Sequence, residues 1–263
     1  MTGRARLTNK VAVVTGSAKG IGRAIAITLA EEGAIIVAAD IDTEAGAATL
    51  AEIRDISPRS TFERVNIADH AEVAAFVDHL VRQFGGIDIL VNNAGVTRQI
   101  DFFDLKPEEV DWIVGVNIKG TFSMMQAVAR VMRERREGRI VNISSIAGKG
   151  YRNTSNIVYA ASKGALIAMT RIAAVQLGKY GIAVNAVCPG LTETELMAAW
   201  LERRAKEGRK LQHDLIKELL ADSVLLRINT PLDVAQAVLF LASDASQNIT
   251  GQSLNVDSGM MWD

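Results

Sequence analysis

Tyr159 and Lys163 are the two residues of this sequence whose types and spacing most directly suggest proton transfer. They lie four positions apart, so they share one face of the helix that the pattern of residues 157–180 predicts. A tyrosine ordinarily titrates near pH ~10, and a neighbouring ammonium lowers the pKa of the phenol. Such a phenol can donate or accept a proton at neutral pH. An unpartnered lysine would be costly on this otherwise apolar helix, which favours a functional pair over a chance surface pattern.

Two hydroxyls, Ser144 and Ser145, end the apolar run 139–144, which we predict to be a buried strand. In an α/β protein the carboxyl ends of the strands form the edge where ligands bind. A hydroxyl at this edge can donate a hydrogen bond to a substrate oxygen. The alternative is a simple turn at the end of a strand.

A glycine-rich segment, residues 15–22, directly follows the first apolar strand, residues 10–15, and opens a predicted helix, residues 20–32. Glycines there let the backbone turn tightly and approach a pyrophosphate, which the positive end of the helix would attract. The spacing of the glycines differs from the common dinucleotide-binding fingerprint. No Gly-Lys-Ser/Thr ends the motif, which argues against the phosphate-binding loop of a nucleoside triphosphatase. We therefore expect a dinucleotide site that includes Gly16, Ser17, Lys19, Gly20, Ile21 and Gly22.

Asp40 ends the second predicted strand, residues 34–40, eighteen positions after Gly22. A carboxylate at this position can accept hydrogen bonds from both ribose hydroxyls of an adenosine and would repel a 2′-phosphate. Lys19 favours NADP instead, because a cation beside the ribose would help to bind that phosphate. We predict NAD rather than NADP, because the charge of Asp40 would face the 2′-phosphate directly.

The elements that must position these residues alternate along the chain. Near-continuous apolar strands that alternate with helices predict an α/β fold: a Rossmann-like, doubly wound parallel sheet of about seven strands with helices on both faces. A helical stretch over 107–137 is interrupted near 115–120. The other expected strands cover residues 61–67, 87–92, 139–144, 182–188 and 253–256, and the other expected helices cover residues 43–54, 69–84, 157–180 and a segment from Pro231.

The chain of 263 residues is expected to form a single dinucleotide-binding domain, residues 1–263. Residues 191–228 interrupt the regular alternation of strands and helices, between the sixth strand and the helix that begins at Pro231. Such an insertion lies over the carboxyl ends of the strands, so we predict a helical substrate lid there.

Composition excludes several other classes of protein. The formal net charge is −1, so no field would attract nucleic acid or an anionic membrane, and one cysteine cannot form an internal disulfide. We expect no signal peptide, no membrane span and a cytoplasmic location, and the three scattered histidines predict no metal site. The helix over 157–177 is apolar on nearly every side, which favours burial against another subunit in a homotetramer or homodimer.

Taken together, these motifs resemble the short-chain dehydrogenase/reductase family, in its one-domain form, over nearly the whole chain. The shared motifs are Thr-Gly-x-x-x-Gly-x-Gly at residues 15–22, Asn-Asn-Ala-Gly at 92–95, Asn117, Ser145, Tyr-x-x-x-Lys at 159–163 and Pro-Gly at 189–190.

The resemblance implies a role for each of these residues. Tyr159 would be the general acid/base, Lys163 would hold the nicotinamide ribose and lower the pKa of Tyr159, Ser145 rather than Ser144 would orient the substrate oxygen, and Asn117 would hold a water that relays protons. The further residues implied to bind the cofactor are Asn66, Ile67, Asn93, Ala94, Gly95, Pro189, Gly190, Thr192 and Thr194.

The sequence departs from the family pattern at three places. Asn66 stands where the family often has Asp, and its carbonyl oxygen can still accept a hydrogen bond. Thirteen residues separate Ser145 from Tyr159, one more than usual, so we expect a bulge in the loop 148–156 near the substrate. Ser258 replaces a usual glycine. The Tyr-Lys spacing excludes the enoyl reductases of this superfamily, which place more residues between the pair.

The predicted function is therefore NAD(H)-dependent interconversion of a secondary alcohol, such as a polyol, a sugar or a similar small hydroxy compound, and its ketone. One alternative is an NADP(H)-dependent enzyme like the 3-oxoacyl reductases. Another is a dinucleotide-binding regulator without turnover, which would not require an acid/base tyrosine.

Overall fold

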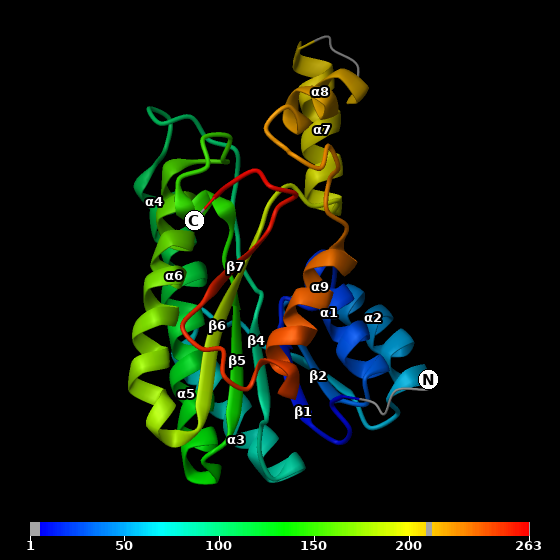
Figure 1. Cartoon of the computed structure of the whole chain (residues 1–263), viewed down its shortest axis with the longest axis vertical. Coiled ribbons are helices and arrows are strands. Elements are labelled where there is room, and N and C mark those ends of the chain that lie inside the picture. The colour runs from blue at the N-terminus through cyan, green and yellow to red at the C-terminus, as the bar shows by residue number, and fades with distance from the viewer. Residues whose placement is uncertain (1–5, 209–211, 263) are drawn as a thin grey trace.

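A seven-stranded parallel sheet forms the centre of the computed structural model, which describes residues 6–208 and 212–262 (Figure 1). The strand order is β3-β2-β1-β4-β5-β6-β7, so the chain winds outward from β1 in one direction, returns, and winds outward in the other. The strands are β1 (Val11–Thr15), β2 (Ile35–Asp40), β3 (Thr61–Arg64), β4 (Ile89–Asn92), β5 (Gly138–Ile143), β6 (Ile182–Pro189) and β7 (Ser253–Val256). The predicted doubly wound α/β fold is confirmed.

Helices cover both faces of this sheet because successive strand residues are apolar on both sides. The main helices are α1 (Gly20–Glu31), α2 (Thr43–Ile56), α3 (His70–Phe84), α4 (Pro107–Val114), α5 (Thr121–Arg135), α6 (Ile157–Leu177), α7 (Glu195–Gly208), α8 (Gln212–Leu220) and α9 (Pro231–Ala242). In β1, Ala12 and Val14 pack with α1 and α9, whereas Val11 and Val13 pack on the face that carries α3 and α5. This two-sided burial explains the unbroken apolar runs in the sequence.

Two of the predicted elements end three residues beyond the observed ones. The third strand ends at Arg64 rather than at residue 67, because its register with β2 pairs Arg64 with Asp40, the last residue of β2. The long helix predicted over 157–180 ends at Leu177 and continues as a 3-10 turn, η3 (Gly178–Tyr180). The interruption predicted near 115–120 is confirmed as a π-helix, η1 (Gly115–Gly120), between α4 and α5.

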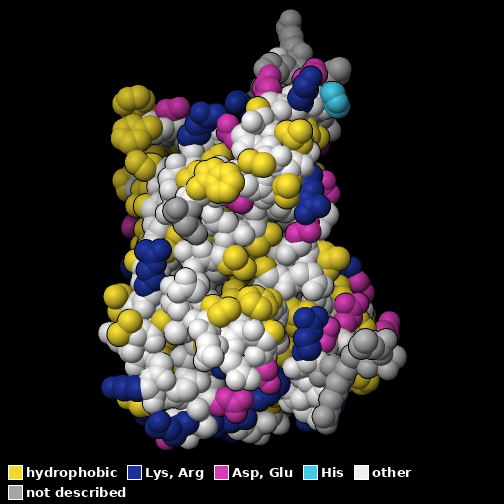
Figure 2. All heavy atoms as spheres, viewed as in Figure 1, with side chains coloured by type: hydrophobic (Ala, Val, Ile, Leu, Met, Phe, Trp, Pro, Cys, Tyr) yellow, Lys and Arg dark blue, Asp and Glu magenta, His cyan; other side chains and the backbone are white. Residues whose placement is uncertain are grey.

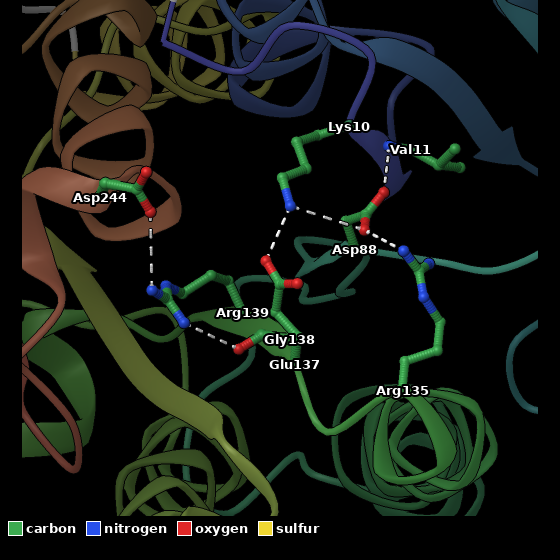
Figure 3. A network of polar contacts seen from close by, with 8 residues as sticks. All are labelled: Lys10, Val11, Asp88, Arg135, Glu137, Gly138, Arg139 and Asp244. Atoms are coloured by element: carbon green, nitrogen blue, oxygen red, sulfur yellow. Dashed lines mark hydrogen bonds and ion pairs between the residues drawn. The ribbon is translucent and has the colours of Figure 1, made fainter.

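A network of charges closes the amino-terminal ends of β1, β4 and β5, opposite the edge where ligands bind (Figure 3). Asp88, which precedes β4, accepts from the backbone N–H of Val11 at 2.7 Å and pairs with Arg135 at 2.9 Å. Lys10 pairs with Glu137 at 2.7 Å. These contacts hold together the starts of three neighbouring strands, and we assign them to the stability of the sheet.

The helix α6 stays partly open to solvent on the side away from the sheet. Its Ile172 and Val175 are 59% and 80% exposed, although the helix packs against β6 on its other side. Within the described residues, Ile157–Tyr180 is the one helical stretch with the length and composition to cross a membrane. Its contacts with β6 are those of a helix within a folded domain. The exposed side is where the predicted subunit interface would lie, and that interface stays a prediction.

Residues 191–228, between β6 and α9, form the α7–α8 segment, of which residues 209–211 lie outside the described part of the chain. Figure 1 shows α7 and α8 projecting beyond the carboxyl ends of the strands, at the top of the view. That this segment acts as a substrate lid stays a prediction.

Candidate active site

A cavity of about 960 Å³ lies at the carboxyl ends of the central strands. Segments that follow β4, β5 and β6 border it, as do the start of α6 and one face of the α7–α8 segment. The predicted site residues that line it are Ile21, Asn93, Gly95, Ser145, Tyr159, Lys163, Pro189, Gly190, Thr192 and Thr194, and Ser144 joins them. The fold thus brings together residues that are as far apart in the sequence as Ile21 and Thr194.

The position of Tyr159 is set by the cap of α6. Asn156 precedes the helix, and its side-chain oxygen accepts from the backbone N–H of Tyr159 at 2.7 Å. The amide nitrogen of Asn156 donates to the carbonyl of Arg98 at 2.8 Å, so the start of α6 is tied to the segment after β4. An asparagine at a helix N-cap is a recognisable sequence signal that our reading of the motif did not use.

Lys163 lies one helical turn further along α6, with only 4% of its surface exposed. Its ammonium donates to the carbonyl oxygen of Ile143 at 2.8 Å, at the end of β5. Burial lowers the pKa of Lys163 to about 8. A Cβ atom on Gly95 would lie 3.3 Å from this ammonium, so the glycine leaves room beside it.

The expectation that Lys163 lowers the pKa of Tyr159 is wrong for this structure. The ammonium lies 5.7 Å from the centre of the tyrosine ring and is hydrogen-bonded to Ile143 instead. Burial raises the pKa of Tyr159 above its ordinary value, and a hydrogen bond with Ser145 offsets part of that rise. Without a bound cofactor, the phenol is therefore protonated at neutral pH and ready to donate.

The two serines after β5 have different partners. The hydroxyl of Ser144, which is 3% exposed, donates to the backbone carbonyl of Lys163 at 2.7 Å. The hydroxyl of Ser145 accepts from the backbone N–H of Ala147 at 3.1 Å, which caps a 3-10 turn, η2 (Ile146–Lys149), and it also contacts Tyr159. A hydroxyl that accepts from Ala147 keeps its own hydrogen for another oxygen. Ser145 is thus the serine that faces the phenol.

Asn117 is fully buried in the π-helix η1, behind Lys163. Its carbonyl oxygen accepts from the backbone N–H of Val96 at 2.8 Å, and its amide donates to the carbonyl of Val96 and to the hydroxyl of Ser162, both at 3.0 Å. Single-turn π-helices inside α-helices are frequent at functional sites. Here the π-helix holds Asn117 against the chain between β4 and α4.

The glycine-rich loop after β1 forms a cradle that side chains would fill. Gly16 has φ +63°, and a Cβ atom on Gly22 would lie 2.1 Å from the carbonyl oxygen of Gly16. Asn93 braces the loop from β4 by donating to that oxygen at 2.8 Å. Lys19, at the N-cap of α1, gives the helix no side-chain cap. The first N–H groups of α1 thus remain available to an anion, and this geometry fits the pyrophosphate of a dinucleotide.

Carboxylates dominate the end of β2, where an adenosine ribose would lie in this fold. Asp40 accepts from the backbone N–H of Ala18 at 3.0 Å and from the N–H of Ile41 at 2.7 Å. Lys19 pairs with Asp42 at 2.8 Å, and this contact lowers the pKa of Asp42 and raises that of Lys19. Our reading of the sequence weighed Lys19 against Asp40 alone and missed Asp42.

Other predicted cofactor residues surround the cavity without lining it. Gly16, Ser17, Lys19, Gly20 and Gly22 form the loop and the start of α1, and Ala94 adjoins Asn93. The side-chain oxygen of Asn66, beyond β3, accepts from the N–H of Ala68 at 3.1 Å, and Ile67 is buried. A smaller cavity of about 450 Å³ is bordered by Gly20 and Thr194. In the described part of the chain, no three His, Cys, Asp or Glu residues are grouped as metal ligands.

Comparisons with known proteins agree with this geometry. A family model described as "Enoyl-(Acyl carrier protein) reductase" matches residues 16–261. The chain is 38% identical to a 3-oxoacyl-[acyl-carrier-protein] reductase of Thermotoga maritima over 97% of this chain and 99% of that protein. It is 37% identical to a 3alpha-hydroxysteroid dehydrogenase of Mediterraneibacter gnavus over 95% of this chain and 96% of the relative. The crystal structure of a levodione reductase superimposes with a TM-score of 0.89 and 31% identity, over 97% and 98% of the two chains. The chain belongs to the short-chain dehydrogenase/reductase family of oxidoreductases.

Proposed function

We propose that this protein interconverts a secondary alcohol and its ketone with NAD(H), and that Tyr159 is the acid/base. The observation that carries the proposal is the convergence of Tyr159, Ser145 and Lys163 on one cavity beside the glycine-rich cradle. A bound nicotinamide would supply or accept the hydride. The groups of the chain itself then have to orient the substrate oxygen and move one proton.

In the direction of ketone reduction, the protonated phenol of Tyr159 donates its proton to the substrate oxygen as the ketone becomes an alcohol. Ser145 holds the same oxygen through the hydrogen that its contact with Ala147 leaves free. Lys163 would hold the nicotinamide ribose, and Asn117 behind it would hold a water that returns protons from solvent. In oxidation the phenolate accepts the hydroxyl proton, which requires the bound cofactor or the substrate to offset the effect of burial on the pKa of Tyr159.

The choice of NAD over NADP is supported by the charges at the end of β2. Asp40 and Asp42 place two carboxylates there, and the ammonium of Lys19 beside them is paired with Asp42. A 2′-phosphate would bring further negative charge next to this pair. The remaining cofactor contacts proposed are those of Asn93, Ala94, Gly95, Pro189, Gly190, Thr192 and Thr194 around the cavity and of Asn66 and Ile67 beyond β3.

Reduction of a 3-oxoacyl thioester by NADP(H) is the second candidate. The names of several relatives support it, and so do two exposed aromatic side chains close to the cavity in the sequence. Phe102 and Phe103 are 65% and 91% exposed in the segment that follows the cavity-lining residues 97–100. Figure 2 shows hydrophobic side chains gathered above α4, where this segment lies. Exposed apolar groups in the segment next to the cavity lining suit an acyl chain better than a polyol.

One panel separates these candidates. Secondary alcohols, polyols, ketones and a 3-oxoacyl thioester would each be offered with NAD(H) and with NADP(H), and the absorbance of the reduced nicotinamide would be followed. We expect turnover with NAD(H) and a small alcohol or ketone. Turnover confined to the thioester with NADP(H) would replace the first candidate by the second.

The variant Tyr159→Phe tests whether the protein is a catalyst at all. An enzyme that uses the phenol should lose turnover by a factor of about a hundred or more, since acid/base groups contribute rates of that order. Its affinity for the cofactor, measured by fluorescence titration, should remain. Equal turnover in the variant and the wild type would remove Tyr159 from the mechanism, and binding without any turnover in the wild type would favour a regulator. A cytoplasmic location and a homotetramer or homodimer remain predictions.

A further inference from the structure

Three consecutive residues of the loop between η2 and α6 converge on one carboxylate of the α7–α8 segment. Arg152 donates to Oδ1 of Asp222 at 2.7 Å, Tyr151 donates its phenol hydrogen to Oδ2 at 3.3 Å, and Asn153 donates to Oδ2 at 3.4 Å. Asp222 lies just after α8, about seventy positions away in the sequence. We call these four residues the latch.

One side of the latch is fixed to the core of the protein. Tyr151 is 6% exposed and packs in an apolar cluster with Ile146, Cys188 and Met260. Its backbone N–H donates to the carbonyl of Ile146 at 3.2 Å. Burial raises the pKa of the Tyr151 phenol, so it remains a hydrogen-bond donor throughout the neutral range. Any movement at the latch must therefore come from the side of Asp222.

The other side belongs to the α7–α8 segment, whose described backbone hydrogen bonds to the rest of the chain lie at its base and beyond α8. At the base, the N–H of Asn229 donates to the carbonyl of Leu191 at 3.0 Å, and the N–H of Glu193 donates to the carbonyl of Asn229 at 2.8 Å. Beyond α8, Leu225 donates to the carbonyl of Ser258 at 3.1 Å. Asp222, also beyond α8, contacts the loop that leads into α6.

Both partners of the latch border the same cavity. Arg152 and Asn153 line it from the loop, and Leu215, Glu218 and Leu219 line it from α8. The contacts of Asp222 therefore join two walls of the cavity that carries Tyr159. A side chain that joins two walls sets the distance between them.

We propose that Asp222 is a positioning residue that holds α8 against the loop 151–153 and thereby fixes the width of the substrate cavity. Asp222 touches no reacting atom, and its action passes through Tyr151, Arg152 and Asn153. The effect on kinetics rests on the proposed function, whereas the effect on the segment itself does not.

The variant Asp222→Ala removes all three contacts of the latch, and Glu32→Gln is its matched control. Glu32 also pairs with one arginine, Arg6, and its side chain is 24% exposed against 25% for Asp222, but it lies at the end of α1, away from the cavity. Tyr151→Phe removes only the phenol contact. A melting curve for each variant shows that it is folded before it is compared.

The first measurement does not depend on activity. Limited digestion with trypsin, read by mass spectrometry, reports opening of the α7–α8 segment, whose sequence contains several Lys and Arg residues. We expect Asp222→Ala to be cut within residues 191–228 about five to ten times faster than the wild type, as the loss of charge-assisted hydrogen bonds implies. Tyr151→Phe should be cut at an intermediate rate and Glu32→Gln at the wild-type rate.

The second measurement is steady-state kinetics with the substrate that the panel identifies. We expect KM for that substrate to rise about tenfold in Asp222→Ala, while kcat changes less than about threefold and cofactor affinity stays constant. Asp222→Glu should restore part of the loss. Cleavage and KM equal to those of Glu32→Gln would overturn the proposal. Faster cleavage in a protein that turns over no substrate would support the latch and count against the proposed function instead.

Discussion

Replacement of Lys163 by methionine should stabilise the folded protein in the absence of cofactor while it abolishes hydride transfer. The ammonium is 4% exposed and has the carbonyl of Ile143 as its hydrogen-bond partner, so folding removes it from water with partial compensation. Methionine has a similar length and can occupy the same space without a charge. The same burial that makes Lys163 useful beside a cofactor is a cost to the empty protein.

The size of the effect follows from the pKa of Lys163. A fall from 10.5 to about 8 corresponds to about 3 kcal/mol of unfolding free energy. Loss of the hydrogen bond to Ile143 destabilises the variant by about 1–2 kcal/mol, so its unfolding free energy should exceed that of the wild type by about 1–2 kcal/mol at pH 7. Between pH 8 and 10.5 the unfolded chain keeps a proton that the folded chain has lost. The unfolding free energy of the wild type therefore rises with pH in that window, and the advantage of the variant disappears by about pH 10.5.

Urea unfolding followed by circular dichroism, at several values between pH 7 and 10.5, measures this difference. Protein concentration must be fixed, because subunit association would shift apparent stability. Lys179→Met is the matched control, since it makes the same substitution at an exposed ammonium. A stability difference between Lys163→Met and the wild type that does not change with pH would refute the argument, because it would mean that the ammonium of Lys163 is not desolvated.

Two further substitutions test the roles assigned around the cavity. Ser145→Ala should lower kcat by a factor of about a hundred, because one donor to the reacting oxygen is lost. Ser144→Ala should mainly lower the melting temperature, because it removes the buried hydrogen bond from the Ser144 hydroxyl to the carbonyl of Lys163. Parallel measurement of kcat and melting temperature distinguishes them, and an equal effect of both variants on kcat would contradict the assignment. Asp40→Asn should reduce the preference for NAD over NADP, as kcat/KM, by a factor of about ten or more, because the charge is removed while the side-chain oxygen is kept. An unchanged ratio would exclude Asp40 from the discrimination.

Much of the fold could be predicted because its determinants are local in the sequence. The apolar residues of β1 occupy both faces of the strand, so the unbroken apolar run in the sequence predicts a strand that is buried on both sides. The end of β3 could not be predicted in this way, because it depends on where its neighbour β2 stops. The π-helix around Asn117 gave a weak signal, a break near two glycines, without its geometry.

Some properties of the candidate site could likewise be predicted from the sequence, and others could not. Tyr159 and Lys163 could be paired from their spacing alone, since a helix fixes that relation. The direction in which the pKa of Tyr159 moves could not be predicted, because it depends on burial by segments remote in the sequence. The choice between Ser144 and Ser145 rested on the family resemblance until their hydrogen-bond partners distinguished them.

By itself, the sequence determined the alternation of strands and helices, the glycine loop that opens α1 and the helical spacing of the tyrosine and lysine, because each follows from the backbone geometry of neighbouring residues. Only the tertiary structure decided which charges are desolvated, that Asp42 engages Lys19, and that Asp222 reaches Tyr151 across the cavity. Solvation and long-range pairing arise when distant segments pack together, and the sequence of neighbouring residues does not specify them.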